Sequence, residues 1–275
     1  MEKDTREHPR STRERAGSCE NSGGSMERVE EPRAFGHFGQ EARAFVGARR
    51  RSGLTAATEW PPRIRVGDGV RFGSCFVYSP HGTGETARYS RSVCLRVKTS
   101  DVEWLPRYVE TVLDHCDLGQ ELVGFFSRET VLVPVPTYLR CTQRRVWGAA
   151  CLASCLKEVG VPGTIWRGLQ RIDAVRKSST ACGSKRPSVQ KHYESLVVAR
   201  APQRVPERLL LIDDVVSSGR TLLACSIRLR ERFPQTPIAA FALIRTLGFV
   251  REIPRLVVPC VGRITWTGVD ARRYP

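Results

Sequence analysis

The chain has 275 residues and a net charge of +16. This length fits one large domain or two small ones. No apolar run is long enough to cross a membrane, and the first residues lack an apolar signal-peptide core. We therefore expect a cytoplasmic protein that has no membrane partner.

The positive charge is concentrated after residue 63, where the net charge is +14, against +2 for residues 1–63. A basic folded part suits a pyrophosphate-bearing ligand or nucleic acid, although an unspecific basic surface gives the same charge, and no nucleic-acid-binding motif is recognisable. The ten cysteines form no Cys-x-x-Cys pair and have no histidine at zinc-finger spacing, which favours unpaired thiols in a reducing compartment. Cys151 and Cys155 lie one helical turn apart, but no further metal ligand is apparent near them.

Residues 1–60 are rich in Arg, Glu, Gly and Ser and have few apolar residues. Such a segment buries too little surface to offset its ordering entropy, so we expect a disordered tail. The composition changes at Pro61. Residues 66–78 predict short strands with turns around their glycines, residues 92–99 predict a strand or the start of a helix, and Asp101 is the expected N-cap of a helix that reaches about His115.

The stretch Thr130-Val-Leu-Val-Pro-Val-Pro predicts a buried strand that the second proline ends. Arg140, Arg144 and Arg145 follow within ten residues, and a helical pattern covers residues 147–159. A strand, a short basic loop and a helix in this order suit an anion, although a solvated loop would have the same composition.

Residues 163–169 and 193–198 predict two strands, and residues 170–191 between them are long, polar and basic. A loop of this length in a compact domain is usually functional or disordered. Residues 238–244 predict another buried strand, and residues 257–266 an edge strand.

The most informative stretch is Leu209-Leu-Leu-Ile-Asp-Asp-Val-Val-Ser-Ser-Gly-Arg-Thr-Leu. Its four leading apolar residues predict a strand that is buried on both faces of a parallel sheet. Asp213 and Asp214 follow at the expected carboxyl end of this strand, where ligands bind in open α/β sheets. The small loop 217–221 then leads into a helical pattern, and amides at a helix N-terminus favour an anion. This stretch therefore predicts a phosphate-binding loop beside two carboxylates.

The pattern of four apolar residues, two acids, two apolar residues, two hydroxyls, glycine, any residue and threonine resembles the phosphoribosyl-pyrophosphate (PRPP) motif of type I phosphoribosyltransferases. In that family the acids contact the ribose 2- and 3-hydroxyls, and the loop wraps the 5-phosphate. The resemblance assigns the ribose and the 5-phosphate to Asp213, Asp214, Val215, Ser217, Ser218, Gly219, Arg220 and Thr221. A buried strand that simply ends in solvated acids is the alternative; a response-regulator receiver domain fits poorly, because its Asp-Asp strand lies near the start.

The order Val-Pro-Val-Pro, basic loop, helix is similar to the pyrophosphate loop of the ComF-like (competence protein F-like) branch of the same family. This likeness assigns pyrophosphate binding to Thr137, Arg140, Arg144 and Arg145, and catalysis to Arg145 together with the two aspartates. It also makes residues 170–191, with Lys185 and Arg186, a flexible loop that closes over PRPP. The chain departs from the branch in two respects: Arg145-Val-Trp-Gly-Ala replaces the common Arg-Gly-Phe-Asn-Gln, and the N-terminal zinc-binding cysteine cluster that many members carry is missing.

The resemblance implies an α/β fold with a mostly parallel sheet and flanking helices. Together with the composition of the tail (residues 1–60), it divides the rest of the chain into a hood-like subdomain (61–129) and a phosphoribosyltransferase-like domain (130–275). The implied activity is transfer of the phosphoribosyl group to an unidentified, nitrogen-type nucleophile, with release of pyrophosphate. Mg²⁺ would bind through PRPP, with Asp213 and Asp214 as candidate protein ligands. A homodimer is an open option. Two other classes stay open: a PRPP or nucleotide sensor without activity, and a ComF-like protein that acts in DNA uptake or with nucleic acid.

Overall fold

The computed structural model describes an α/β fold whose centre is a seven-stranded sheet, and the residues that it describes are 60, 64–117, 122, 124–140, 146–176, 186–199, 202, 204–248 and 250–275. In spatial order the strands are β3 (Thr164–Ile165), β2 (Thr130–Pro134), β6 (Arg208–Val216), β7 (Ile238–Thr246), β1 (Gly69–Tyr78), β8 (Val257–Trp266) and β9 (Ala271–Tyr274). The first five run parallel to one another, and β8 and β9 are antiparallel additions. The expected mostly parallel sheet is thus confirmed.

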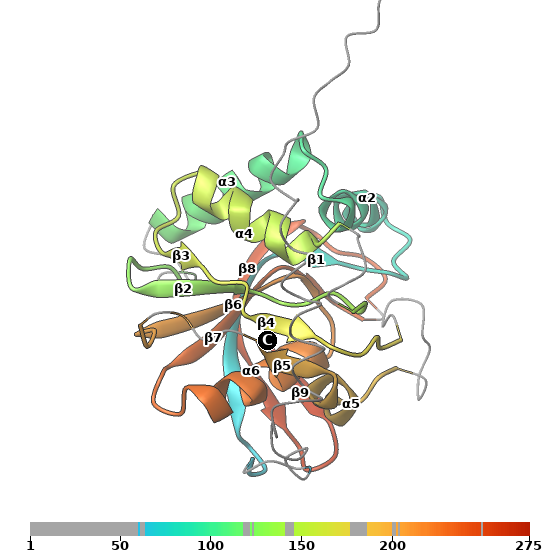
Figure 1. The fold of residues 1–275 in the computed structure, drawn as a ribbon. Coiled ribbons are helices and arrows are strands. Elements are labelled where there is room, and N and C mark those ends of the chain that lie inside the picture. Colours follow the sequence, from blue (N-terminus) through green and yellow to red (C-terminus); the bar gives the residue numbers. More distant parts are fainter. Residues whose placement is uncertain are drawn as a thin grey trace, which may run out of the picture. The chain divides into compact units, whose positions relative to one another are not determined.

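Helices cover both faces of the sheet, as Figure 1 shows. One face carries α2 (Glu85–Thr99), α3 (Trp104–Asp117) and α4 (Gly148–Glu158). The other face carries α5 (Val189–Glu194), α6 (Arg220–Arg232) and the small antiparallel pair of β4 (Leu169–Arg171) and β5 (Leu196–Val198). No helix in these described residues combines the length and the apolar character that a membrane crossing requires.

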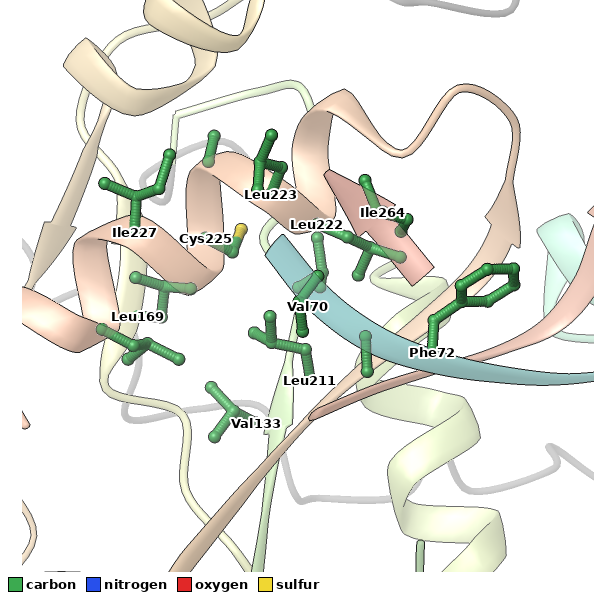
Figure 2. Close-up of a cluster of buried hydrophobic side chains, with 14 of the residues drawn as sticks. Val70, Phe72, Val133, Leu169, Leu211, Leu222, Leu223, Cys225, Ile227 and Ile264 are labelled. Carbon is green, nitrogen blue, oxygen red and sulfur yellow. The ribbon is translucent and has the colours of Figure 1, made fainter. Parts of the chain in front are cut away.

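Side-chain alternation along β6 explains why its apolar run is continuous. Leu209 and Leu211 pack into the core on the α6 face, whereas Leu210 and Ile212 pack into the core beneath α2, α3 and α4. All four are fully buried, so this central strand needs apolar residues at every position. Figure 2 shows the first of these cores, in which Leu222 of α6 meets side chains from the strands.

Several elements differ from their predicted form. The region around β1 is one ten-residue strand rather than short strands with turns, and it lies inside the sheet between β7 and β8. Residues 85–99 form a full helix. The helix predicted after Asp101 is present, and the Asp101 carboxylate accepts hydrogen bonds from the backbone N–H groups of Glu103 and Trp104. The strand predicted at 193–198 is a short helix followed by a three-residue strand.

The C-terminal part of the chain also differs from the edge strand that residues 257–266 predict. β8 is a strand, but β9 pairs with it and forms the actual edge of the sheet. Val257 to Trp266 therefore lie between two strands. This arrangement brings the turn between β8 and β9 to α6, as the contacts of Arg220 with that turn show below.

Candidate functional site

The two predicted acids lie inside β6, not in the loop that follows it. β6 pairs with β7 through Val216, so both carboxylates extend from backbone that is held in the sheet. Asp214 N donates to Asp213 Oδ1 at 3.0 Å, and Val215 N donates to Asp214 Oδ1 at 2.7 Å. The acids are therefore fixed by the sheet and by their own backbone, and both are partly buried.

Alternation along β6 directs the two acids to different neighbours. Asp213 lines a cavity on the α6 face of the sheet. Asp214 lies on the α4 face, where a Cβ atom at Gly148, the first residue of α4, would be 3.5 Å from Asp214 Oδ2. A carboxylate near a helix N-terminus is stabilised by the helix dipole. The structure thus brings Asp213, but not Asp214, to the lining of the cavity.

The carboxyl group of Asp213 has a pKa well above its usual value. Burial is the main cause, and the neighbouring Asp214 carboxylate adds to it, while Lys98 of α2 acts in the opposite direction. Negative charge on Asp213 is therefore unfavourable until a cation approaches. Lys98, which the sequence analysis did not single out, is an exposed cation on the side of the site that α2 contributes.

The phosphate loop predicted at 217–221 connects β6 to α6 and forms most of the wall of this cavity. The cavity has a volume of about 80 Å³ and is lined by Arg186, Asp213, Val215, Val216, Ser217, Ser218, Gly219, Arg220, Thr221 and Leu222. α6 begins directly after Gly219, which has no side chain that could cap the helix. The N–H groups of the first turn are thus open to an anionic ligand.

Gly219 is required for a reason that the sequence did not reveal. Its φ of +83° lies in the left-handed region, as expected for a glycine in this loop. A Cβ atom here, however, would lie 2.7 Å from side-chain carbons of Ile264 in β8, so the space that the glycine leaves open is filled by protein and not by a phosphate. The loop therefore rests directly on β8.

Arg220 is held by an acid rather than directed at the cavity alone. Its Nε lies 2.8 Å from Asp270 Oδ1 and 2.9 Å from Asp270 Oδ2, and its Nη2 also pairs with Oδ2. Asp270 belongs to the turn between β8 and β9, 50 residues away in the sequence. The charge of Arg220, the arginine of the loop 217–221, is thus already paired.

The predicted pyrophosphate residues are only partly described. Thr137 follows β2, and its backbone oxygen accepts a hydrogen bond from Arg171 Nε at 2.6 Å. Arg140 Nη2 lies 3.1 Å from Asp173 Oδ1, and both side chains are more than half exposed. Arg144 and Arg145 lie outside the described residues, so their assigned roles stay predictions.

The predicted basic loop 170–191 is shorter than expected, because its ends belong to β4 and α5. Arg186 lines the cavity. Lys185 lies outside the described residues. Arg171, which counts as a loop cation in the sequence, is instead the last residue of β4 and is only 1% exposed. Val175 N also donates to Tyr138 O at 2.9 Å, which ties the start of the loop to the segment after β2.

His192 of α5 is a second residue that the sequence gave no reason to select. It is 3% exposed, its Nε2 lies 3.4 Å from Thr221 Oγ1, and its buried Nδ1 has no hydrogen-bond partner among the described residues. Burial, together with the charges of Arg171 and Arg220, lowers its pKa to about 3, so the ring is neutral near pH 7. Only the three-dimensional contact with Thr221 identifies it.

In the part of the chain that the structure describes, no group of three or more His, Cys, Asp or Glu side chains is arranged to hold a metal ion. Asp213 and Asp214 supply hard oxygen ligands of the type that Mg²⁺ prefers. Cys151 and Cys155 have free thiols, and burial raises the pKa of Cys155 to about 11.

The geometry therefore combines one carboxylate of raised pKa, a loop at a helix N-terminus, and an arginine from a separate segment around one small cavity. Such a set of groups can hold a phosphorylated ligand that also carries a cation or developing positive charge. Neither the scan against protein-family models nor the search of curated proteins gives a match for this chain.

Proposed function

We propose that the chain is a phosphoribosyltransferase-type protein that binds Mg²⁺-PRPP and transfers its phosphoribosyl group to a nitrogen-type nucleophile. One observation supports this proposal above all: Asp213 and the loop 217–221 line the same cavity at the start of α6. A sugar phosphate needs both parts, because its hydroxyls suit a carboxylate and its phosphate suits the loop.

The electrostatics of Asp213 suit the charges that such a transfer develops. The bond from ribose C1 to pyrophosphate breaks while the nucleophile attacks, so positive charge develops on the ring and negative charge on the leaving group. A carboxylate whose charge is unfavourable in the free protein is stabilised most when positive charge develops next to it. Asp213 would thus interact more strongly with the transition state than with the substrate.

Mg²⁺ would be held mainly by the pyrophosphate oxygens of PRPP, with Asp213 and Asp214 as candidate protein ligands. When bound, the ion neutralises charge on the leaving group.

Arg186 enters the cavity wall from the segment before α5, and we propose that the loop 170–191 closes over PRPP through this residue and Lys185. Thr137, Arg140, Arg144 and Arg145 would hold pyrophosphate on the β2 side.

The hood-like role of residues 61–129 is part of the same proposal. α2 supports it, since the charge of Lys98 opposes the rise in the pKa of Asp213, and the pKa of Cys94 in α2 is raised mainly by burial and further by Asp214. α2 would cover the acids on the side away from α6. A ligand bound at the carboxyl end of β6 would be covered on that side and shielded from water, which competes with the acceptor as a nucleophile.

Titration calorimetry with Mg²⁺-PRPP tests the binding part of this proposal, with the Asp213→Asn/Asp214→Asn double variant as the matched protein. We expect the original chain to bind Mg²⁺-PRPP and the double variant not to bind it. Equal affinities of the two proteins would contradict the assignment. A screen of nucleobases and amines for PRPP-dependent pyrophosphate release then tests turnover. Tight binding without release in any reaction would favour the sensor alternative over the enzyme.

A further inference from the structure

Arg171 is a buried arginine whose hydrogen-bond partners are neutral groups. Its guanidinium is 1% exposed, and within the described ranges no carboxylate forms an ion pair with it. A buried charge without an opposite partner is costly, and burial lowers the pKa of this group. Arg171 is held instead by neutral acceptors: Nε donates to Thr137 O at 2.6 Å, and Nη1 donates to Ser195 Oγ.

These acceptors lie on two different sides of the site. Thr137 belongs to the segment that leaves β2. Ser195 Oγ donates in turn to His192 O at 2.6 Å, and the ring of His192 contacts Thr221. One series of polar contacts, in the order Thr137, Arg171, Ser195, His192 and Thr221, therefore joins the exit of β2 to the loop 217–221; its three middle residues are buried and its two ends are partly buried.

The His192 end of this series also orients a donor in the cavity wall. The ring is neutral, and its buried Nδ1 has no partner in the part of the chain that the structure describes. An N–H group left unbonded there would cost more than a bare ring nitrogen, so hydrogen bonding assigns the proton to Nε2. With the proton on Nε2, this nitrogen is the donor in its 3.4 Å contact with Thr221 Oγ1. The hydroxyl hydrogen of Thr221 is left to donate to a ligand in the cavity that Thr221 lines.

We propose that Arg171 is a positioning residue that fixes the segment after β2 relative to the loop 217–221. This inference rests on the proposed function, in which PRPP spans these segments with its pyrophosphate and its 5-phosphate. Arg171 itself would contact no part of the ligand. Its effect would appear only with a ligand that must reach both segments at once.

Fragments of PRPP separate this role from a general structural one. Ribose 5-phosphate requires the loop 217–221 and pyrophosphate requires the β2 side, whereas PRPP requires both in the correct relative position. In Arg171→Lys the charge stays but one ammonium cannot reproduce the two-point contact, and in Arg171→Met the charge is lost as well. Arg228→Lys is the control, because Arg228 donates to Tyr193 O of α5 at 2.9 Å and, among the described residues, forms no hydrogen bond with either segment.

In calorimetry on the full chain with Mg²⁺, we expect Arg171→Lys to weaken PRPP binding about tenfold or more while each fragment changes by less than about threefold. Amide hydrogen exchange of the peptides that contain 137–139 and 217–221 should become faster in this variant, and Arg228→Lys should leave both results at the level of the original chain.

Equal losses for PRPP and both fragments would overturn positioning in favour of general destabilisation. A loss in Arg171→Met but none in Arg171→Lys would show that only the charge matters, which also overturns it. If the original chain binds no PRPP, the proposed function fails, and the exchange measurement still decides whether Arg171 couples the two segments. Unchanged exchange in both peptides would then contradict the coupling.

Discussion

Arg220 and Asp270 form a two-point ion pair that fixes the first residue of α6 to the turn between β8 and β9. The side chains are 24% and 32% exposed, so the pair is shielded from water more than an ordinary surface pair. Together with the packing of Gly219 on Ile264, this ion pair holds the loop 217–221 against β8 and the turn that follows it. This relationship gives the first prediction.

Replacing Asp270 with Asn should lower the free energy of unfolding by about 1 kcal/mol, because the guanidinium of Arg220 loses its charged partner while part of that loss is screened by solvent. Urea denaturation measures this change. A double-mutant cycle with Arg220→Gln isolates the pair. A coupling energy near zero would show that the two side chains stabilise the turn independently.

Asp213→Asn should make the protein more stable while it removes binding. The pKa of Asp213 is raised in the folded state, so the folded chain holds this proton more tightly than the unfolded chain. Stability is therefore highest below the usual pKa of an aspartate and falls as the pH rises towards the folded pKa. Near pH 7 the variant should have a higher melting temperature than the original chain. Its melting temperature should no longer rise when Mg²⁺-PRPP is added. A lower melting temperature without ligand would contradict the raised pKa.

Gly219→Ala should be much more harmful than Gly124→Ala, although both glycines have a φ of +83°. The shared backbone strain costs about 1–2 kcal/mol in each variant. A Cβ atom at Gly124 meets nothing within 4 Å, whereas one at Gly219 meets Ile264. That collision adds about 1–3 kcal/mol, as overpacking in a core does. Chemical denaturation of the two variants gives the difference directly. Equal destabilisation would mean that Ile264 moves away without cost.

His192 should make the protein sensitive to mild acid. Its folded pKa of about 3 lies below the usual histidine pKa of 6.5, so between these values the unfolded chain takes up a proton that the folded chain does not. The stability that the neutral ring contributes is present above pH 6.5 and is lost as the pH falls, at up to about 1.4 kcal/mol per pH unit. Arg171 and Arg220 strengthen this effect, and Asp270 opposes it.

The measurement is urea denaturation between pH 4.5 and 7.5 for the original chain and for His192→Gln. The variant should show a flatter dependence of stability on pH, because glutamine has no proton to gain in this range. Parallel curves for the two proteins would assign the acid sensitivity to other groups.

Residues 209–216 show how much the sequence could predict. Their apolar run can only be accommodated where both sheet faces are covered, so the central strand and the acids at its end followed from local composition. The direction of each acid did not follow as readily, because it depends on where β6 ends. The strand runs on through Val216, and this extension places Asp213 and Asp214 on opposite faces.

Other features could not be predicted because they depend on distant contacts. Gly73 seemed to be a turn residue, yet it lies inside β1, where a Cβ atom would be 3.1 Å from the side chains of Leu122 and Phe125. α2 was missed over its first half because its buried face uses small residues such as Ala87 and Ser90. Arg171 lies in a stretch whose basic composition predicts a loop, and its hydrogen-bond partner Thr137 is 34 residues away in the sequence.

The packing of the loop 217–221 on β8 also affects the order of events in folding. The loop packs on Ile264 of β8, and its Arg220 pairs with Asp270 of the turn after β8. It can therefore become rigid only after β8 and β9 have joined β1. Pairings between distant segments are the slow steps of folding. During refolding, the affinity for a phosphorylated ligand should therefore appear late, after most of the helices and strands have formed. An early folding species would already contain β6 and α6 but would not yet recognise a phosphate.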